Sequence, residues 1–286
     1  MEELKMNHAM VGFIDVLGFS SRLTSAAHNE DLIKIYGEMK SVHRIFEKEL
    51  DDQTAMDAHK AMAKSVISLS DALVVSVDFD SDFASCTPKL DVQAIVLSDL
   101  ARQQAEAVMN GIFIRGGVAL GYYYREQDII LSDALVRAYE TENCTCMPVI
   151  GLDYRFYNSF ASNPDTNDYA PESMPKNMIE CFVNPRTGCT VHFVDYFSVA
   201  VSSFSDFYCD EDNDAYKATD DCREKQRILN ESCTRSELKF VDAHAQSVRI
   251  ELAKKHPKPI QDKYEWLKDF HNRSVDKFGY GEEHKI

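Results

Sequence analysis

Residues 11–20, with the sequence VGFIDVLGFS, constrain the fold of this chain more than any other segment. Apolar residues and glycine occupy both strand faces here, so the alternation of a half-exposed strand is missing. The pattern predicts a strand covered on both sides that leads through a glycine turn into a helix. The only charge in the segment is Asp15, and a buried carboxylate needs a partner. A metal ion, a cation such as Arg115 and backbone N–H groups all fit, and we favour the metal.

The overall charge limits the partners of the chain. Its 286 residues include 31 Lys and Arg against 47 Asp and Glu, which gives a formal net charge of −16. Such a chain offers no basic stripe for nucleic-acid phosphates or for an anionic membrane surface. We therefore expect no nucleic-acid partner. A nucleotide ligand stays compatible with this charge, because a bound divalent metal inverts the local sign.

Apolar runs and cysteines indicate the cellular compartment. The N-terminal apolar run is short and contains Asp15, unlike a signal peptide, and no run of about 18 apolar residues is present to span a membrane. The 8 cysteines are scattered, and Cys144-x-Cys146 lacks a second half with the spacing of a zinc site. These features predict a cytoplasmic protein with reduced thiols and no direct membrane association.

Hydrophobic periodicity predicts alternating strands and helices in the first half of the chain. We expect strands at 9–17, 112–121 and 148–151, helices at 21–50, 91–109 and 134–142, and two strands within 65–78 that meet at Ser70 and Asp71. This order matches the ferredoxin-like (split β-α-β) architecture, an antiparallel sheet with two helices on one face. The first strand is expected to lie centrally, beside the second and third, so that Asp15 lies next to the turn at Asp71.

The second half of the chain has a different pattern. Strands are expected within 180–202 and helices within 222–278, and the acidic segment 206–221 indicates a solvated loop or a frayed helix start. We therefore divide the chain into a core of residues 1–152 and a C-terminal, α-rich extension of residues 153–286 that packs on the core. The predicted fold class is α+β.

Asp15 and Asp71 form the predicted metal site. Carboxylates on adjacent strands supply the hard oxygen ligands that Mg²⁺ prefers, and substrate phosphates complete its coordination. Two such ions can activate an attacking oxygen and stabilise the leaving one. Gly18, Phe19 and Ser20 fit a phosphate cradle, because glycine permits a close approach of the backbone and the start of the following helix presents free N–H groups.

These residues resemble the motifs of a known family. Residues 13–20, FIDVLGFS, closely resemble the first metal motif of class III nucleotidyl cyclases, Phe-x-Asp-Ile-x-Gly-Phe-Thr/Ser. Ser70-Asp71 stands where that family has Gly-Asp, its second metal carboxylate. Residues 115–121, RGGVALG, are similar to the family's Arg-x-Gly-hydrophobic-x-x-Gly strand. The resemblance covers about residues 9–151, and it implies the class III cyclase core.

Three positions depart from the purine cyclases. Ile67 stands four residues before Asp71, where those enzymes carry a purine-selecting Lys or Glu, and Val136 and Glu140 replace an Asn and an Arg on the last core helix. The chain is more similar to the bacterial pyrimidine cyclases of Pycsar antiphage defence. Those proteins share the Ser-Asp motif, the Arg-Gly-Gly strand and the helix motif at 134–142, and residues 264–272 also resemble theirs.

This resemblance implies a bacterial enzyme that converts UTP or CTP into the 3′,5′-cyclic monophosphate and pyrophosphate, for a separate effector protein that senses the product. It implies a homodimer with two equivalent sites. Each site would hold two Mn²⁺ or Mg²⁺ ions on Asp15, Asp71 and the Val16 carbonyl. Arg115 joins the two aspartates as an implied catalytic residue, and the implied nucleotide contacts are Phe13, Gly18, Phe19, Ser20 and Ile67. An adenylate cyclase and a degenerate domain that binds nucleotide without turnover are the alternatives.

Structural roles stay open for several of these residues. Asp71 alone is typical of a turn, and Arg115 either binds phosphate or neutralises the carboxylates. Gly116 and Gly117 fit close strand packing. Four further side chains are expected in structural roles, namely a surface ion pair of Arg137 with Glu140 and packing of Trp266 and His271.

Overall fold

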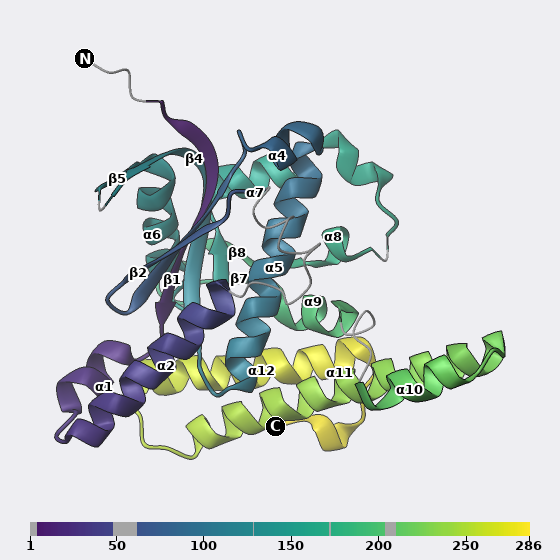
Figure 1. The fold of residues 1–286 in the computed structure, drawn as a ribbon. Helices are drawn as coiled ribbons and strands as arrows, with labels where there is room; N and C mark the ends of the chain where they lie inside the picture. Colours follow the sequence, from purple (N-terminus) through teal and green to yellow (C-terminus); the bar gives the residue numbers. More distant parts are fainter. Residues whose placement is uncertain (1–4, 48–61, 128, 172, 204–209) are drawn as a thin grey trace.

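The computed structural model describes residues 5–47, 62–127, 129–171, 173–203 and 210–286, and it contains one mixed sheet with helices on both faces (Figure 1). The strands follow the order β2-β3-β1-β4-β6-β8-β7, and β5 pairs with β4. Their bounds are β1 Asn7–Val16, β2 Ser65–Leu69, β3 Ala72–Asp78, β4 Ile114–Glu126, β5 Ile129–Ser132, β6 Ile150–Leu152, β7 Ile179–Val183 and β8 Thr190–Val194.

Helices lie between these strands and after the last of them. They are α1 Phe19–Ser25, α2 Asn29–Glu47, α4 Asp82–Cys86, α5 Lys89–Met109, α6 Asp133–Thr145, α7 Tyr154–Ala161, α8 Met174–Asn177, α9 Tyr196–Ser203, α10 Asp210–Ala218, α11 Cys222–Leu252 and α12 Lys258–Phe278. Short 3₁₀ segments cover Pro164–Asp168 and Glu282–His284. The α+β class and the C-terminal helical region are therefore as predicted.

The strand β1 lies at the centre of the four-stranded part of the sheet. It pairs antiparallel with β3 on one side and with β4 on the other, and β2 pairs antiparallel with β3. This is the ferredoxin-like order, and the antiparallel core is confirmed. The expectation that the first strand lies beside the second was wrong, because β2 forms the outer edge and only β3 separates it from β1.

Alternate residues of β1 pack into two hydrophobic clusters. Met10 and Ile14 belong to the main core, together with buried side chains of α2 and α5. Ala9 and Val11 face the opposite way, into a smaller cluster that includes Ala134 of α6. The strand is therefore covered on both faces, which explains the absence of alternation in its sequence.

Glycines on β4 and β6 allow α6 to lie directly on the sheet. A Cβ atom at Gly117 would overlap the carbonyl oxygen of Ala138 and lie 2.7 Å from the backbone nitrogen of Glu142. At Gly116, on the other face of β4, a Cβ atom would lie 2.8 Å from the carbonyl oxygen of Phe13. Close strand packing is thus confirmed for Gly116, whereas Gly117 packs against α6 and sets the distance between α6 and the sheet.

Replacing Gly117 by alanine is expected to destabilise the protein by roughly 1–3 kcal/mol or more, the usual cost of overpacking a core. The added methyl group meets backbone atoms of α6, which cannot rotate away. Gly37→Ala is the matched control, since Gly37 lies in α2 with nothing within 4 Å of an added Cβ. The control should gain about 0.5–1 kcal/mol in chemical denaturation. Equal stability of G117A and the wild type would contradict this packing.

Two predicted segments differ from the structure. The single helix expected at 21–50 is divided into α1 and α2, because the Asp31 carboxylate accepts hydrogen bonds from the backbone N–H groups of Ala27 and His28 and so fixes a new helix start. Residues 48–50 lie outside the described residues. Within the predicted strands at 180–202, residues 196–203 form α9. Asp195 caps this helix by accepting from Ser198 N at 3.0 Å. An apolar run of this kind does not distinguish a buried strand from a buried helix.

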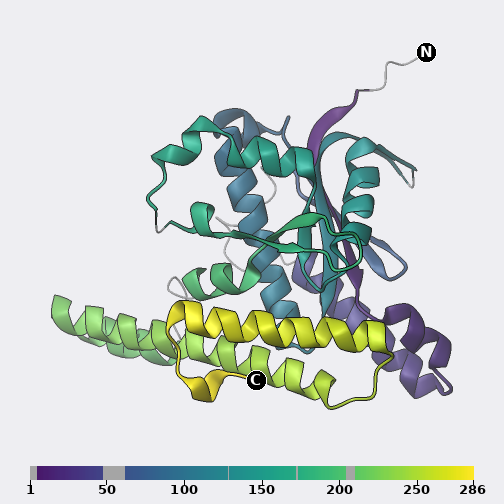
Figure 2. The same ribbon diagram turned by 180° about the vertical axis from the view of Figure 1, so that it is seen from behind.

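The C-terminal half continues the same sheet and adds a layer of helices. The strand β6 pairs parallel with β4 and antiparallel with β8, and β7 closes the far edge. Figures 1 and 2 show α11 and α12 side by side along one side of the molecule. The acidic segment contains the helix α10 over residues 210–218, and residues 204–209 lie outside the described residues. The division at 152 stays a prediction, since one sheet crosses it.

A chain of neutral hydrogen bonds anchors α12 in this layer. His271 Nε2 donates to the carbonyl oxygen of His284 at 2.8 Å, so its Nδ1 must accept from His244 Nδ1 at 3.0 Å. The Nε2 atom of His244 then accepts from the hydroxyl of Tyr196 at 2.7 Å. Burial lowers the pKa of both His244 and His271, which keeps the two rings neutral. Packing of His271 is therefore as predicted, and Trp266 packs against Phe270.

Lys277 forms a second polar anchor of α12. Its Nζ atom lies 2.9 Å from Asp195 Oδ2, 2.9 Å from Glu180 Oε1 and 2.9 Å from Ser198 Oγ. Asp195 is fully buried at the start of α9, and Glu180 lies on β7. The ammonium group therefore ties α12 to both elements.

Candidate functional site

Asp15 and Asp71 lie at the same end of neighbouring strands. In the β1–β3 register Asp15 is opposite Ala72, so Asp71 comes directly before its partner in the tight turn between β2 and β3. Ser70 has a positive φ of 58° in this turn, and the carbonyl oxygen of Asp71 accepts from Val16 N at 3.2 Å. The predicted neighbourhood of the two carboxylates thus exists, although it comes from pairing of β1 with β3.

A glycine turn follows β1 and begins α1. Gly18 has a φ of 76°, a left-handed conformation that glycine adopts without strain, and Leu17 N donates to Phe113 O at 2.8 Å. The chain then enters α1 at Phe19, where Ser20 Oγ donates to Asp71 Oδ2 at 3.1 Å. The first turn of α1 is therefore held against the second carboxylate.

These segments surround one open cavity with a volume of about 390 Å³. Every residue predicted for the site except Ile67 lines it, namely Phe13, Asp15, Val16, Gly18, Phe19, Ser20, Asp71 and Arg115. Ile67 lies on β2 opposite Val74, whose partner on the other side is Phe13 of β1, and both side chains pack against the smaller hydrophobic cluster. Ile67 is thus near Phe13 but outside the cavity wall.

Arg115 lies between two carboxylates. It donates from Nε to Asp15 Oδ2 at 2.8 Å, which is the ion pair considered from the sequence as the alternative partner of Asp15. Glu142 of α6 has its Oε1 atom 2.7 Å from the same nitrogen. The single Nε–H group points to Asp15, so within the described part of the chain Glu142 Oε1 is buried without a hydrogen bond.

The cavity has an excess of negative charge. Burial raises the pKa of Asp15 against the opposing effect of Arg115, and the charge of Asp71 raises it further. Burial also raises the pKa of Glu142, again with Arg115 opposing and Asp15 adding to the rise. The cavity wall therefore carries three carboxylates against two cations, Arg115 and Lys263, and further positive charge would stabilise the ionised carboxylates.

The donor set fits divalent metal ions of the Mg²⁺ and Mn²⁺ type. Asp15 and Asp71 supply carboxylate oxygens, and Val16, whose backbone carbonyl is the third expected ligand, lines the same cavity. Among the described residues, however, no group of three or more His, Cys, Asp or Glu side chains is close enough to hold a metal by itself. Metal binding at such a site is expected to depend on additional oxygen ligands, such as the phosphates of a nucleotide.

Sequence reasoning missed two charged residues of this cavity, Glu142 and Lys263. Glu142 is one helical turn after Ala138, and both face β4, so the spacing of α6 carried a signal for it. Lys263 reaches the cavity from α12. No local pattern could indicate that a helix so distant in sequence lies at this site.

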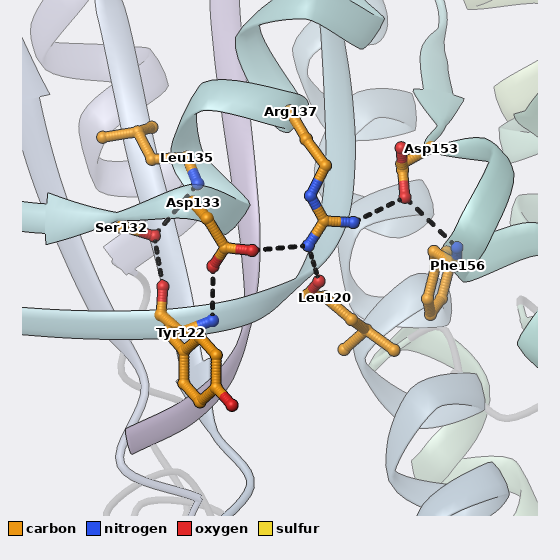
Figure 3. A network of polar contacts seen from close by, with 8 residues as sticks. All are labelled: Leu120, Tyr122, Ser132, Asp133, Leu135, Arg137, Asp153 and Phe156. Carbon is orange, nitrogen blue, oxygen red and sulfur yellow. Dashed lines mark hydrogen bonds and ion pairs between the residues drawn. The ribbon is translucent and has the colours of Figure 1, made fainter. Parts of the chain in front are cut away.

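Arg137 has a structural role away from the cavity (Figure 3). Its guanidinium contacts Asp153 Oδ2 at 3.0 Å, Asp133 Oδ2 at 3.2 Å and the carbonyl oxygen of Leu120. The predicted surface pair of Arg137 with Glu140 was wrong, because Asp133 lies one turn before Arg137 on the face of α6 that meets β4. This cluster holds α6 on β4 and joins both to the start of α7.

Val136 and Glu140, two of the three positions that depart from the purine cyclases, lie on the outer side of α6. Val136 is 56% exposed, and Glu140 is exposed as well. Tyr139, between them in sequence, lines the cavity and meets Phe13 edge-to-face, with ring centroids 5.3 Å apart. Neither Val136 nor Glu140 reaches the cavity of its own chain.

Comparisons with known proteins give weak likenesses only. No protein-family model and no curated protein matches the chain. Among solved structures, the adenylyl cyclase CyaB from P. aeruginosa aligns with a TM-score of 0.43 and 12% identity over 67% of this chain and 95% of that chain. A bacterial light-regulated adenylyl cyclase gives 0.35 and 15% over 67% and 92%, and the guanylyl cyclase Cya2 gives 0.36 and 10% over 67% and 92%. We therefore base the function on the chain's own residues.

None of the described helices has both the length and the apolar character that a membrane span requires.

Proposed function

We propose that this protein is a metal-dependent nucleotidyl cyclase, a phosphorus–oxygen lyase that forms a 3′,5′-cyclic nucleotide and pyrophosphate from a pyrimidine nucleoside triphosphate. The observation that carries the proposal is the joint position of Asp15, Asp71 and the start of α1 around one cavity. Two carboxylates suit divalent ions, and a glycine turn followed by the free backbone N–H groups at the start of α1 suits the phosphates of a triphosphate.

In the proposed reaction the ribose 3′ hydroxyl loses its proton to solvent water and its oxygen attacks the α-phosphorus. The bond from that phosphorus to the oxygen bridging it to the β-phosphorus breaks, and pyrophosphate leaves with the electron pair. Asp15, Asp71 and the Val16 carbonyl would hold two Mn²⁺ or Mg²⁺ ions, whose charge makes the 3′ hydroxyl more acidic and stabilises the leaving group. Backbone groups at Gly18 and Phe19 position the phosphates. Catalysis is then mainly orientation and charge stabilisation.

Arg115 fits a positioning role in this scheme. Its Nε–H group holds Asp15 in place at 2.8 Å, and Glu142 balances the guanidinium from the other side. If a divalent ion were bound by Asp15, the guanidinium of Arg115 could turn toward Glu142 Oε1. That oxygen has no hydrogen bond within the described residues. The same ion pair favours the second candidate, a cyclase-like domain that binds nucleotide without turnover, because it leaves Asp15 already neutralised.

The pyrimidine preference rests on the residues that depart from the purine cyclases. Ile67 places an apolar side chain at the sequence position where the purine cyclases carry a charged, purine-selecting group, and we expect UTP ahead of CTP. A homodimer is supported by exposed apolar side chains over β4, β5 and α6, namely Tyr122, Ile129, Leu131, Val136 and Tyr139. The motif resemblance supports a bacterial, cytoplasmic role in antiphage defence with a separate effector that senses the product.

The direct test is an incubation of the purified protein with ATP, GTP, CTP or UTP and Mn²⁺, read by mass. We expect a 3′,5′-cyclic product and pyrophosphate from UTP or CTP, and no product when EDTA removes the metal. Cyclic product from ATP alone would identify an adenylate cyclase instead. If none of the four NTPs gives a product but an NTP with Mn²⁺ stabilises the fold, the protein is the second candidate, a domain that binds nucleotide without turnover.

A further inference from the structure

The helix α12 contributes to the wall of the candidate active site. Ile260 and Lys263, in its first two turns, line the same cavity as Asp15, Asp71 and Arg115. Lys263 is partly buried and interacts electrostatically with Glu142 and Asp15. It lies outside the metal motifs and the Arg-Gly-Gly strand, which fall within about residues 9–151, and directly before residues 264–272, which also resemble the pyrimidine cyclases.

Among the described residues, Lys263 is also the cation of this cavity wall that forms no ion pair with a carboxylate. The charged side chains of the wall are Asp15, Asp71, Arg115, Glu142 and Lys263. Arg115 already lies 2.8 Å from one carboxylate and 2.7 Å from another. In the part of the chain that the structure describes, Lys263 forms no ion pair within 4 Å, so its charge is available to a ligand.

Burial makes the positive charge of the Lys263 ammonium group energetically unfavourable. The loss of water around Lys263 lowers the pKa of its amino group, and the charge of Arg115 lowers it further. An anion in the cavity would offset both effects, since it replaces lost hydration with a charge-assisted contact. Phosphate oxygens are suitable partners, because a lysine ammonium binds them as a point charge.

The backbone of Lys263 is fixed in relation to Arg115. The next residue, Tyr264, is buried and meets Phe113 edge-to-face, with ring centroids 5.2 Å apart. Phe113 precedes β4, on which Arg115 lies, and Leu267 holds the following turn of α12 in the core. Lys263 is therefore presented from a rigid element, which lowers the entropy that is lost when it binds a ligand.

We propose that Lys263 binds the triphosphate of the substrate, so that α12 of the C-terminal region completes the active site. The proposal rests on the proposed nucleotidyl cyclase function. Because pyrophosphate carries the same groups, Lys263 also holds the leaving product. A contact made equally to substrate and transition state lowers KM more than it raises kcat.

The test compares Lys263→Met and Lys263→Arg with Lys258→Met, a control from the same helix whose side chain is 87% exposed and pairs with Asp262 at the surface. The probe is inorganic tripolyphosphate with Mn²⁺, measured by calorimetry on the full chain. We expect about tenfold weaker binding for K263M, the size of one charge-assisted contact. K263R should stay within about threefold of the wild type because it keeps the charge, and K258M should be unchanged.

The outcomes separate this proposal from the cyclase itself. Unchanged tripolyphosphate binding by K263M, or no binding by the wild type, overturns the role of Lys263. A lowered unfolding temperature of unliganded K263M without rescue by K263R overturns it in favour of a structural role. If the wild type binds tripolyphosphate through Lys263 but cyclises no NTP, the polyphosphate site stands and the proposed turnover fails. In an active enzyme, KM for the NTP should rise about tenfold with a smaller change in kcat.

Discussion

Replacing Asp71 by asparagine is expected to lower the rate of cyclic nucleotide formation on the order of 10³-fold, the upper range seen when one charge-stabilising group is removed from an active site. Asparagine keeps the size of the side chain and suits the same turn. It can still accept the hydrogen bond of Ser20, which lies 3.1 Å from Asp71 Oδ2. The substitution therefore removes negative charge with little change of shape, and the loss reports on metal binding.

The measurement is the initial rate of product formation with saturating Mn²⁺ and NTP, together with the unfolding temperature. Asp82→Asn is the matched control, since Asp82 is an exposed carboxylate in the first turn of α4, away from the cavity. D82N should keep full activity. An active D71N enzyme, or a D71N protein that the NTP and Mn²⁺ stabilise as strongly as the wild type, would show that Asp71 is a structural turn residue only.

Replacing Lys277 by methionine is expected to cost about 3 kcal/mol of folding stability, the lower end of the range for breaking a buried ion pair. Asp195 is fully buried; once the ammonium is gone it keeps its hydrogen bond from Ser198 N but loses the cation that neutralises it. The side chain of Lys277 is 39% exposed, so water can partly replace it, which places the loss at the lower end. The same change also leaves Glu180 without its cation.

Chemical denaturation measures this loss, with Lys258→Met as the surface control that should change stability by less than about 1 kcal/mol. The double variant D195N/K277M should lose less than the sum of the two single variants, because it leaves no unpaired buried charge. Additive losses would mean that Lys277 and Asp195 are not energetically coupled. A K277M protein as stable as the wild type would contradict the anchoring role.

The local pattern was sufficient for several elements of the N-terminal half of the fold. The strand at 7–16, the turn at Ser70 and Asp71 and the helix α5 all carry their own signals, namely continuous apolar runs, turn residues and helical periodicity. The neighbourhood of Asp15 and Asp71 was predicted from the element order, although the expected pairing of the first strand with the second was wrong.

What the sequence left unresolved depends on contacts between distant segments. The order of β1, β3 and β4 is set by packing of both sheet faces, which no single segment encodes. The helix α9 shows the same difficulty, because its apolar run fits a buried strand equally well until the cap at Asp195 is known. Lys263 reaches the cavity only because α12 docks beside Phe113.

The parallel pairing of β4 with β6 has a consequence for aggregation. A protein that ends at residue 152 would finish in a three-residue strand bonded on one side, with its other side left as an open edge. Unpaired backbone N–H and C=O groups at such an edge can form strand-to-strand hydrogen bonds with other molecules. The strands β8 and β7 cover this edge in the full chain, so the C-terminal half also serves as protection against edge-to-edge association.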